Sequence, residues 1–97
     1  MTRAEAIRIL HKALPGLKER YGVQELALFG SVARDEAGPG SDIDVLVTFQ
    51  GRTRFRAFMG LQFELEDLLG VKVDLATQKA LKPLARPSIM KDLVHVP

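Results

Sequence analysis

The sequence contains no cysteine, which excludes disulfide bonds and thiolate metal sites, so no covalent cross-link stabilises the fold. No apolar run approaches the roughly 18–20 residues that a membrane-spanning helix needs. The first residues, from Met1 to Glu5, lack the apolar core of a signal peptide. The formal net charge of +2 is too small to argue for a nucleic-acid groove, and we expect no direct nucleic-acid partner. These absences predict a soluble, cytoplasmic protein that does not act at a membrane.

The composition is that of an ordinary small globular domain. The 97 residues are 46% hydrophobic and 27% charged, which is enough apolar material for a real core. The chain has no repeats, no low-complexity segments and no interdomain linker, so residues 1–97 are expected to form a single domain.

Apolar spacing and turn residues predict the order of the elements. A capping-box pattern at Thr2 opens a helix that Pro15 is expected to interrupt and Gly22 to end. Ser31 is expected to cap one or two helical turns that reach about Glu36. Strands are predicted at about 26–29, 42–49, 71–76 and 93–96, and a second long helix at about 52–70, with a turn at 38–40.

The longer elements show which side chains should form the core. The second strand has alternating apolar residues, and the second long helix has an apolar stripe at helical spacing. The expected core positions are Ile43, Val45, Val47 and Phe49 on the strand and Phe58, Leu61, Leu65 and Leu68 on the helix.

Gly30-Ser31 is followed, after ten residues, by Asp42-Ile43-Asp44. A Gly-Ser pair that leaves an apolar run lets backbone N–H groups and a hydroxyl approach a phosphate, because glycine has no Cβ. Two aspartates at i and i+2 on a strand point to the same face and repel each other unless a cation lies between them. Hard divalent ions prefer such oxygen ligands. The combination indicates metal-assisted transfer of a phosphate-containing group.

The same motif constrains the topology of the sheet. Ser31 lies at the end of the first predicted strand and Asp42 at the start of the second. Both can meet one phosphate only if these ends are adjacent, which requires the two strands to run antiparallel. We therefore expect an α/β (α+β) protein with a small mixed sheet flanked by helices.

The pattern of Gly-Ser, ten residues and Asp-x-Asp resembles the signature of the nucleotidyltransferase superfamily that includes DNA polymerase beta. The short chain and the form GSVAR…SDIDVLV are most similar to the minimal nucleotidyltransferases (MNT). These are small prokaryotic proteins that often pair with a HEPN-domain partner as antitoxin and toxin. The third carboxylate of the family fits Asp74, in Val71-Lys72-Val73-Asp74-Leu75. The resemblance implies the nucleotidyltransferase fold.

The resemblance also implies a mechanism. Asp42 and Asp44 would bind two Mg²⁺ ions, and Asp74 would ligate the second ion and help to draw a proton from the acceptor. Gly30 and Ser31 would position the β- and γ-phosphates of ATP. The reaction would transfer AMP to a hydroxyl, for which the implied acceptor is a tyrosine of a HEPN ribonuclease.

Three of these features also have purely structural interpretations. Gly30-Ser31 alone could be a helix cap, and a single aspartate such as Asp74 is common on an exposed strand face. Arg34 could contact a phosphate or pair with Asp35 or Glu36.

Two other functions are open at this stage. The chain could be a non-catalytic module that neutralises a partner by contact, although such a module needs none of the three aspartates. It could instead modify a small molecule of the aminoglycoside type, although larger relatives do so with a second domain. We expect 97 residues to leave no room for that domain, so that another subunit completes the acceptor pocket.

The run Arg52-Thr53-Arg54-Phe55-Arg56 has no place in this mechanism. It could form an edge that contacts phosphates or a partner, but a solvated helix start is the more ordinary interpretation. Basic residues at the start of a helix oppose its dipole, so the run is unexplained. Phe63 lies off the apolar stripe and is expected at the edge of the core, or in contact with a partner.

Overall fold

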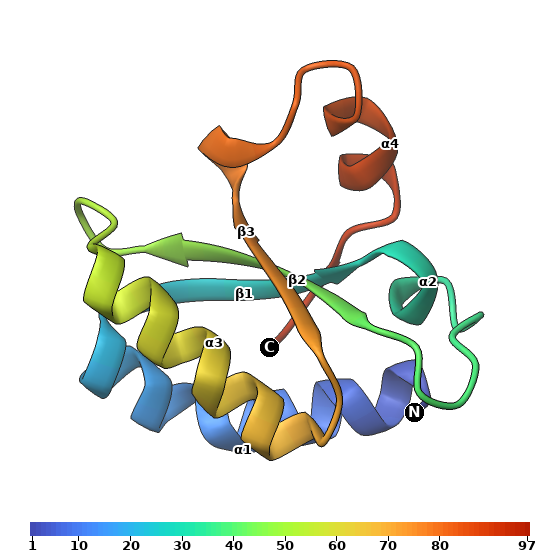
Figure 1. Ribbon diagram of the computed structural model, residues 1–97, viewed down its shortest axis with the longest axis horizontal. Helices are drawn as coiled ribbons and strands as arrows, with labels where there is room; N and C mark the ends of the chain where they lie inside the picture. The colour runs from blue at the N-terminus through green and yellow to red at the C-terminus, as the bar shows by residue number, and fades with distance from the viewer.

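The computed structural model describes residues 1–97, which form nine elements along the chain (Figure 1). A long helix and a strand are followed by one helical turn and a second strand. A second long helix then leads to a third strand, a 3-10 turn, a short helix and a last short strand. The elements are α1 (Arg3–Tyr21), β1 (Val23–Phe29), α2 (Gly30–Ala33), β2 (Ile43–Phe49), α3 (Phe55–Leu69), β3 (Val73–Thr77), η1 (Gln78–Ala80), α4 (Arg86–Lys91) and β4 (Val94–His95).

The four strands form one mixed sheet in the order β3-β2-β1-β4. β1 runs antiparallel to β2 and to β4, whereas β2 and β3 are parallel. The predicted antiparallel pairing of the first two strands and the predicted mixed sheet are both confirmed.

The helices α1 and α3 lie side by side on one face of the sheet and cover the main core (Figure 1). The four predicted core positions of β2 are all buried. On α3 the buried stripe ends at Leu69, whereas the predicted Leu68 is 39% exposed, so the stripe is shifted by one residue at the end of the helix. Phe63 is 62% exposed and is therefore not at the edge of the core.

The opposite face of the sheet carries a much smaller apolar cluster. It consists of Ala27, Phe29, Leu46 and Leu81, with Ala76, Ile89 and Leu93 packed against it. The chain from η1 to α4 supplies this cover and rises away from the sheet (Figure 1).

The helix α1 differs from its prediction at Pro15. The N-cap is as expected, because the Thr2 hydroxyl accepts a hydrogen bond of 3.1 Å from the Glu5 N–H. The helix then continues through Pro15 and ends at Gly22, which has φ 71°. The proline removes only the hydrogen bond to the carbonyl of His11, and both residues are exposed, so water can replace the missing donor.

Strand boundaries differ from the predictions by a few residues. β1 begins at Val23 rather than Leu26, with an irregular register between Val23 and Glu25. β3 occupies 73–77 rather than 71–76, and β4 has two residues. None of the helices is long and apolar enough to span a membrane.

Candidate active site

The sequence-predicted site residues meet at one end of the sheet. Phe29, the last residue of β1, pairs with Asp44 on β2, and Asp44 is in register with Asp74 on the parallel strand β3. Gly30 follows Phe29 directly, and Asp42 precedes the first residue of β2. Three adjacent strands therefore bring the two halves of the motif and the later aspartate together.

Strand alternation decides which way the carboxylates point. Ile43, Val45 and Val73 are buried in the main core, so Asp44 and Asp74 lie on the opposite face of the sheet. Asp44 is half-buried, whereas Asp42 and Asp74 are exposed. The carboxylates thus sit on the open face, away from α1 and α3, where a ligand can reach them.

The electrostatics of the site centre on Asp44. Burial raises the pKa of its carboxyl, and the nearby Asp74 raises that pKa further through its charge and a hydrogen bond. The charge of Asp42 acts in the same direction, and Arg34 partly opposes the shift. The charges of Asp74 and Asp42 both oppose ionisation of Asp44, and a bound cation would relieve this repulsion.

The donor set can be compared with the requirements of a divalent metal. No group of three or more His, Cys, Asp or Glu side chains is placed to hold a metal ion by itself in this structure. The side chains with the chemistry to hold one together with the phosphates of a substrate are Asp42, Asp44 and Asp74, which offer only oxygen donors of one charge. Such a set fits Mg²⁺, which binds through one or two carboxylates and the phosphates of its substrate.

Gly30 is required for a reason that the sequence did not reveal. Its φ is +69°, and a Cβ at this position would clash with the carboxylate of Asp44, whose Cγ would lie 3.1 Å away. The glycine was predicted to admit a phosphate, and it also makes room for the chain's own carboxylate. The turn and the aspartate cluster are thus in direct contact.

Ser31 is not the helix cap that the sequence predicted. Phe29 keeps an extended backbone, with φ −142°, and occupies the N-cap position, so that α2 already begins at Gly30. Ser31 is half-buried, and its hydroxyl makes no hydrogen bond to the rest of the chain. The hydroxyl is therefore available to a ligand.

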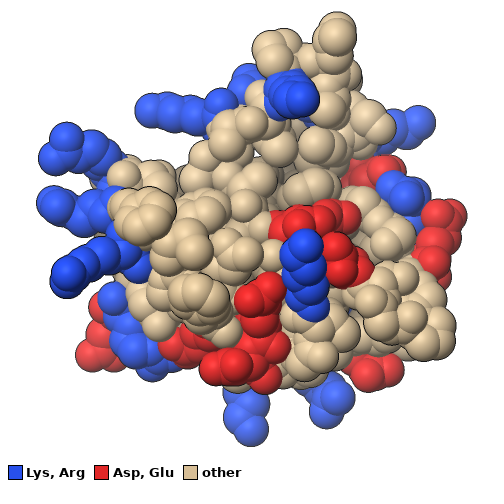
Figure 2. Space-filling model, viewed as in Figure 1, with Lys and Arg blue, Asp and Glu red and all other residues tan.

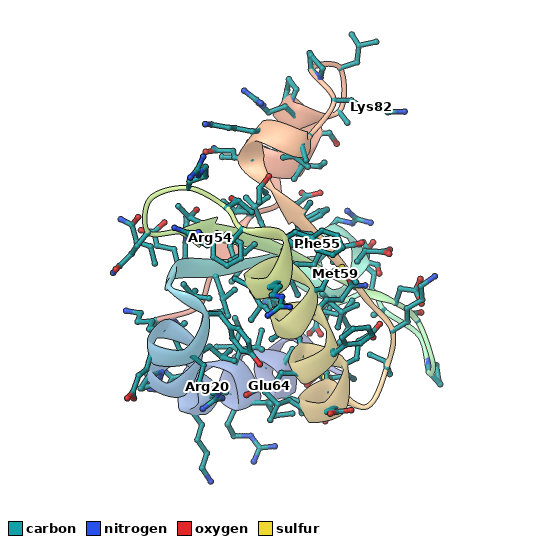
Figure 3. All side chains as sticks on the ribbon, turned by 60° about the vertical axis from the view of Figure 1, so that its left-hand side comes forward. Arg20, Arg54, Phe55, Met59, Glu64 and Lys82 are labelled. Carbon is teal, nitrogen blue, oxygen red and sulfur yellow. The ribbon has the colours of Figure 1, made fainter.

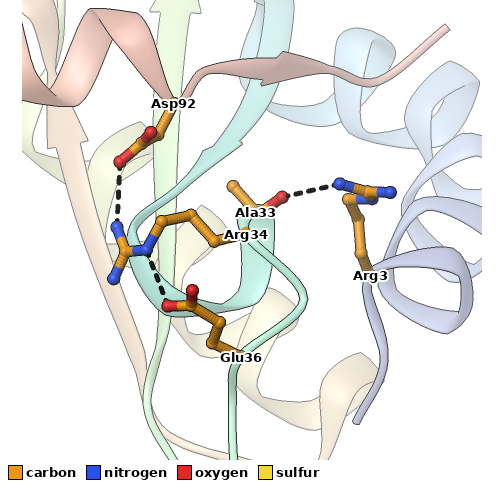
Figure 4. Close-up of polar contacts among 5 residues, drawn as sticks. All are labelled: Arg3, Ala33, Arg34, Glu36 and Asp92. Atoms are coloured by element: carbon orange, nitrogen blue, oxygen red, sulfur yellow. Dashed lines mark hydrogen bonds and ion pairs between the residues drawn. The ribbon is translucent and has the colours of Figure 1, made fainter.

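Arg34 joins the turn to the end of the chain (Figure 4). Its Nε donates to Glu36 at 3.0 Å and its Nη1 donates to Asp92 at 2.9 Å. Both carboxylates raise the pKa of its guanidinium. The sequence allowed Arg34 either to contact a phosphate or to pair with a nearby carboxylate, and the structure contains the pair with Glu36. The second partner, Asp92, lies 58 residues further along the chain, so no local sequence pattern could have predicted this contact.

Arg3 holds the same turn from the other side. Its Nη1 donates to the carbonyl of Ala33 at 3.0 Å (Figure 4). Its backbone N–H donates to the carboxylate of Asp35 at 3.0 Å. Asp35 has φ 61°, so the chain reverses sharply just after α2. The start of α1 and the end of α4 thus fix the Gly30-Ser31 turn from both ends of the sequence.

The geometry can now be compared with known proteins. Residues 10–96 match the family model "Nucleotidyltransferase domain". The chain belongs to the nucleotidyltransferase domain family. It is 45% identical, over 98% of both chains, to "Putative protein adenylyltransferase MJ0128" of Methanocaldococcus jannaschii. It is also 39% identical to "Protein adenylyltransferase MntA" of Thermococcus cleftensis, over 95% of this chain and 91% of that protein.

Solved structures share the fold of this nucleotidyltransferase. One described as "Structure of putative minimal nucleotidyltransferase" has a TM-score of 0.79 and 35% identity, over 97% of this chain and 95% of that chain. Another is a tri-AMPylated Shewanella oneidensis HEPN toxin in complex with MNT antitoxin. It matches with a TM-score of 0.65 and 18% identity, over 94% of this chain and 71% of that chain, a likeness of fold alone. The predicted nucleotidyltransferase fold and the predicted MNT resemblance are confirmed.

Proposed function

We propose that this nucleotidyltransferase transfers AMP from ATP to a hydroxyl group of a protein. The observation that carries the proposal is the meeting of Asp42, Asp44 and Asp74 beside the Gly30-Ser31 turn. Two relatives that align with nearly the whole chain bear the name protein adenylyltransferase, which supports ATP as the nucleotide and a protein as the acceptor.

Each site residue has a proposed role that follows from its position. Asp42, Asp44 and Asp74 would hold Mg²⁺, which supplies positive charge to the phosphates and lowers the pKa of a hydroxyl. The Ser31 hydroxyl and the backbone N–H groups of the turn would contact the β- and γ-phosphates. Arg34, fixed by Glu36 and Asp92, would place further positive charge beside them.

The chemistry then needs a proton acceptor. Asp74 is exposed and adjacent to the other carboxylates, so an acceptor hydroxyl can reach it and give up its proton there. The acceptor oxygen forms a bond to the α-phosphorus as the bond from that phosphorus to pyrophosphate breaks. The residues orient both reactants, and no covalent intermediate with the enzyme is required.

We further propose that the acceptor is a tyrosine of a HEPN-domain toxin, and that the protein is its antitoxin. The support is the shared fold with an MNT antitoxin seen in complex with an AMPylated HEPN toxin. In this proposal the partner presents the hydroxyl, and the domain formed by residues 1–97 supplies the nucleotide site.

The variant Asp74→Asn tests whether the protein acts by chemistry or by contact. ATP labelled at the α-phosphate is incubated with Mg²⁺, the full chain and a HEPN-domain protein encoded beside it. We expect wild type to label the partner and Asp74→Asn to lose labelling, because the variant lacks the exposed carboxylate proposed to take the proton of the acceptor. ATP binding should persist through Asp42 and Asp44, and the two proteins should still form a complex.

Asp67→Asn is the matched control, because Asp67 is an exposed aspartate of α3 outside the site, and it should label the partner like wild type. Growth of cells that express the partner separates the two functions. If Asp74→Asn protects these cells as well as wild type does, the protein acts by contact and the catalytic proposal fails.

A further inference from the structure

Two segments of the chain carry positive charge and no negative charge. Residues 50–57 and 77–91 together hold seven of the 14 Lys and Arg residues and none of the 12 Asp and Glu residues. The small net charge therefore averages a basic region with an acidic remainder. Figure 2 shows Lys and Arg side chains projecting from the end of the molecule where β2 leads into α3, whereas Asp and Glu gather at its centre and lower half.

The two basic segments meet at a groove of about 810 Å³. The groove lies at the ends of β2 and β3 that are opposite the aspartate cluster. The lining residue of β2 nearest to the cluster is Val47, which is three residues from Asp44, or about 10 Å at roughly 3.3 Å per residue. None of the lining residues is a residue of the proposed nucleotide site. The polar lining of the groove consists of Thr48, Arg52, Thr53, Thr77, Gln78 and Lys79, with no acidic side chain.

The arginines beside the groove have no partners within the chain. Arg52, Arg54 and Arg56 are exposed and take part in none of the three salt bridges, which involve only Arg20 and Arg34. They surround the first turn of α3, which contains no acidic residue. Their position opposes the helix dipole, and nothing in the chain compensates this cost, so an external anion is the simplest compensation.

An exposed aromatic ring lies next to the groove. Phe55 is 79% exposed and is the first residue of α3, directly after Arg54 (Figure 3) and two residues after Thr53 of the groove lining. Arg86 reaches the same region, because its Nη2 donates to the carbonyl of Gln78 at 2.9 Å. Cations that hold phosphates and an open ring on which a base can stack are the two parts of a site for single-stranded nucleic acid.

We propose that this groove binds single-stranded nucleic acid. The phosphates lie on Arg52, Arg54, Arg56 and Lys79, and a base stacks on Phe55. The hydroxyls of Thr53 and Thr77 are placed to donate to the sugar-phosphate backbone. The groove shares no residue with the proposed nucleotide site, and the proposal departs from the expectation, based on net charge, that no nucleic acid binds directly.

The test is fluorescence anisotropy with the full chain and a labelled 20-nucleotide single-stranded RNA of mixed sequence. The triple variant Arg52→Gln/Arg54→Gln/Arg56→Gln is compared with Arg8→Gln/Lys12→Gln/Lys18→Gln, which removes three exposed charges from α1. We expect the first variant to bind far more weakly than wild type and the second to bind nearly normally. The slope of log K against log salt should fall by about 2, since each lost phosphate contact contributes roughly 0.7. Equal binding by the two triple variants would overturn the proposal.

A second pair of variants tests stacking and needs no change of charge. Phe55→Ala should lose about fivefold or more in affinity, because stacking on an aromatic ring is worth roughly 1 kcal/mol or more per base. Phe63→Ala, a second exposed phenylalanine on α3, should bind like wild type. If the triple variant does not fold, the comparison of Phe55→Ala with Phe63→Ala decides whether the proposal holds. A Phe55→Ala variant that binds the RNA as tightly as wild type overturns the proposal.

Two further ligands identify what the groove recognises. Single-stranded DNA of the same sequence should bind as tightly as the RNA if contacts to the phosphates and base stacking dominate. It should bind more weakly than the RNA if the 2′-hydroxyl contributes, and both results support the proposal. Polyglutamate should compete weakly. If it displaces RNA at equal charge concentration, the groove selects acidic protein rather than nucleic acid, and the proposal is wrong.

Discussion

Gly30 shows how one residue can serve both the backbone and the site. Its φ of +69° lies in the left-handed region, and its missing Cβ leaves space for the carboxylate of Asp44. Gly40 has a similar φ of +75°, but nothing lies within 4 Å of the position that its Cβ would take. Comparing the same substitution at the two glycines therefore separates the free-energy cost of backbone strain, which both share, from the cost of displacing the Asp44 carboxylate, which only Gly30 has.

We expect Gly40→Ala to lose about 1–2 kcal/mol of unfolding free energy, because it places a side chain in the left-handed region, and Gly30→Ala to lose more, because its methyl group also displaces Asp44. Only Gly30→Ala should also lose ATP affinity, since the new methyl group pushes Asp44 out of position. Thermal unfolding measures the first effect and calorimetry with ATP and Mg²⁺ the second. If Gly30→Ala binds ATP as tightly as Gly40→Ala, the phosphates do not lie at this turn.

The raised pKa of Asp44 predicts the sign of its effect on stability. An aspartate whose pKa is higher in the folded state is less easily ionised there than in the unfolded chain. Its charge therefore lowers the stability of the fold at neutral pH, and this loss disappears as the pH falls and the group is protonated. Replacing Asp44 by asparagine should thus leave the fold at pH 7 at least as stable as wild type.

Between elements, one polar cluster joins α1 to α3. Glu64 of α3 pairs with Arg20 near the end of α1 (Figure 3). It also accepts a hydrogen bond of 2.8 Å from the hydroxyl of Tyr21, the last residue of α1. The hydrogen bond from Arg20 is the main cause that lowers the pKa of Glu64. The contribution of this cluster is therefore present above the ordinary Glu pKa of 4.5 and is lost as the pH falls through the lower folded value.

Glu64→Gln should consequently lower the melting temperature at pH 7 by a few degrees at most, because pairs exposed to solvent are worth little. The difference from wild type should shrink as the pH is lowered below 4.5, where Glu64 in the unfolded chain becomes protonated. Glu19→Gln, an exposed and unpaired neighbour on α1, is the control. A gap in melting temperature that stays constant down to pH 3 would show that the ion pair does not link these helices.

The elements could largely be predicted because their signals are local. Thr2 and Gly22 mark the ends of α1, and the alternation of Ile43, Val45 and Val47 marks the buried face of β2. The errors occur where tertiary context overrides a local preference. Pro15 is tolerated because it faces solvent, and Ser31 is displaced from the cap because α2 already begins at Gly30.

For the whole molecule, the motif predicted the site residues, but not what fixes them. The spacing from Gly30 to Asp44 requires two antiparallel strands, and the structure has them. The contacts of Arg34 with Asp92 and of Arg3 with Ala33 join segments that are far apart in sequence, so no local pattern contains them. The basic groove was hidden for the same reason, since the two segments that line it are separated by α3 and β3.

The central claim is that the aspartates beside the Gly30-Ser31 turn perform nucleotidyl transfer. The most direct test is transfer of labelled AMP by Asp42→Asn, Asp44→Asn and the double variant, with the melting temperature of each measured in parallel. We predict that every variant loses transfer to background while its melting temperature at pH 7 stays at or above that of wild type. Transfer by the double variant at the wild-type rate would contradict the account.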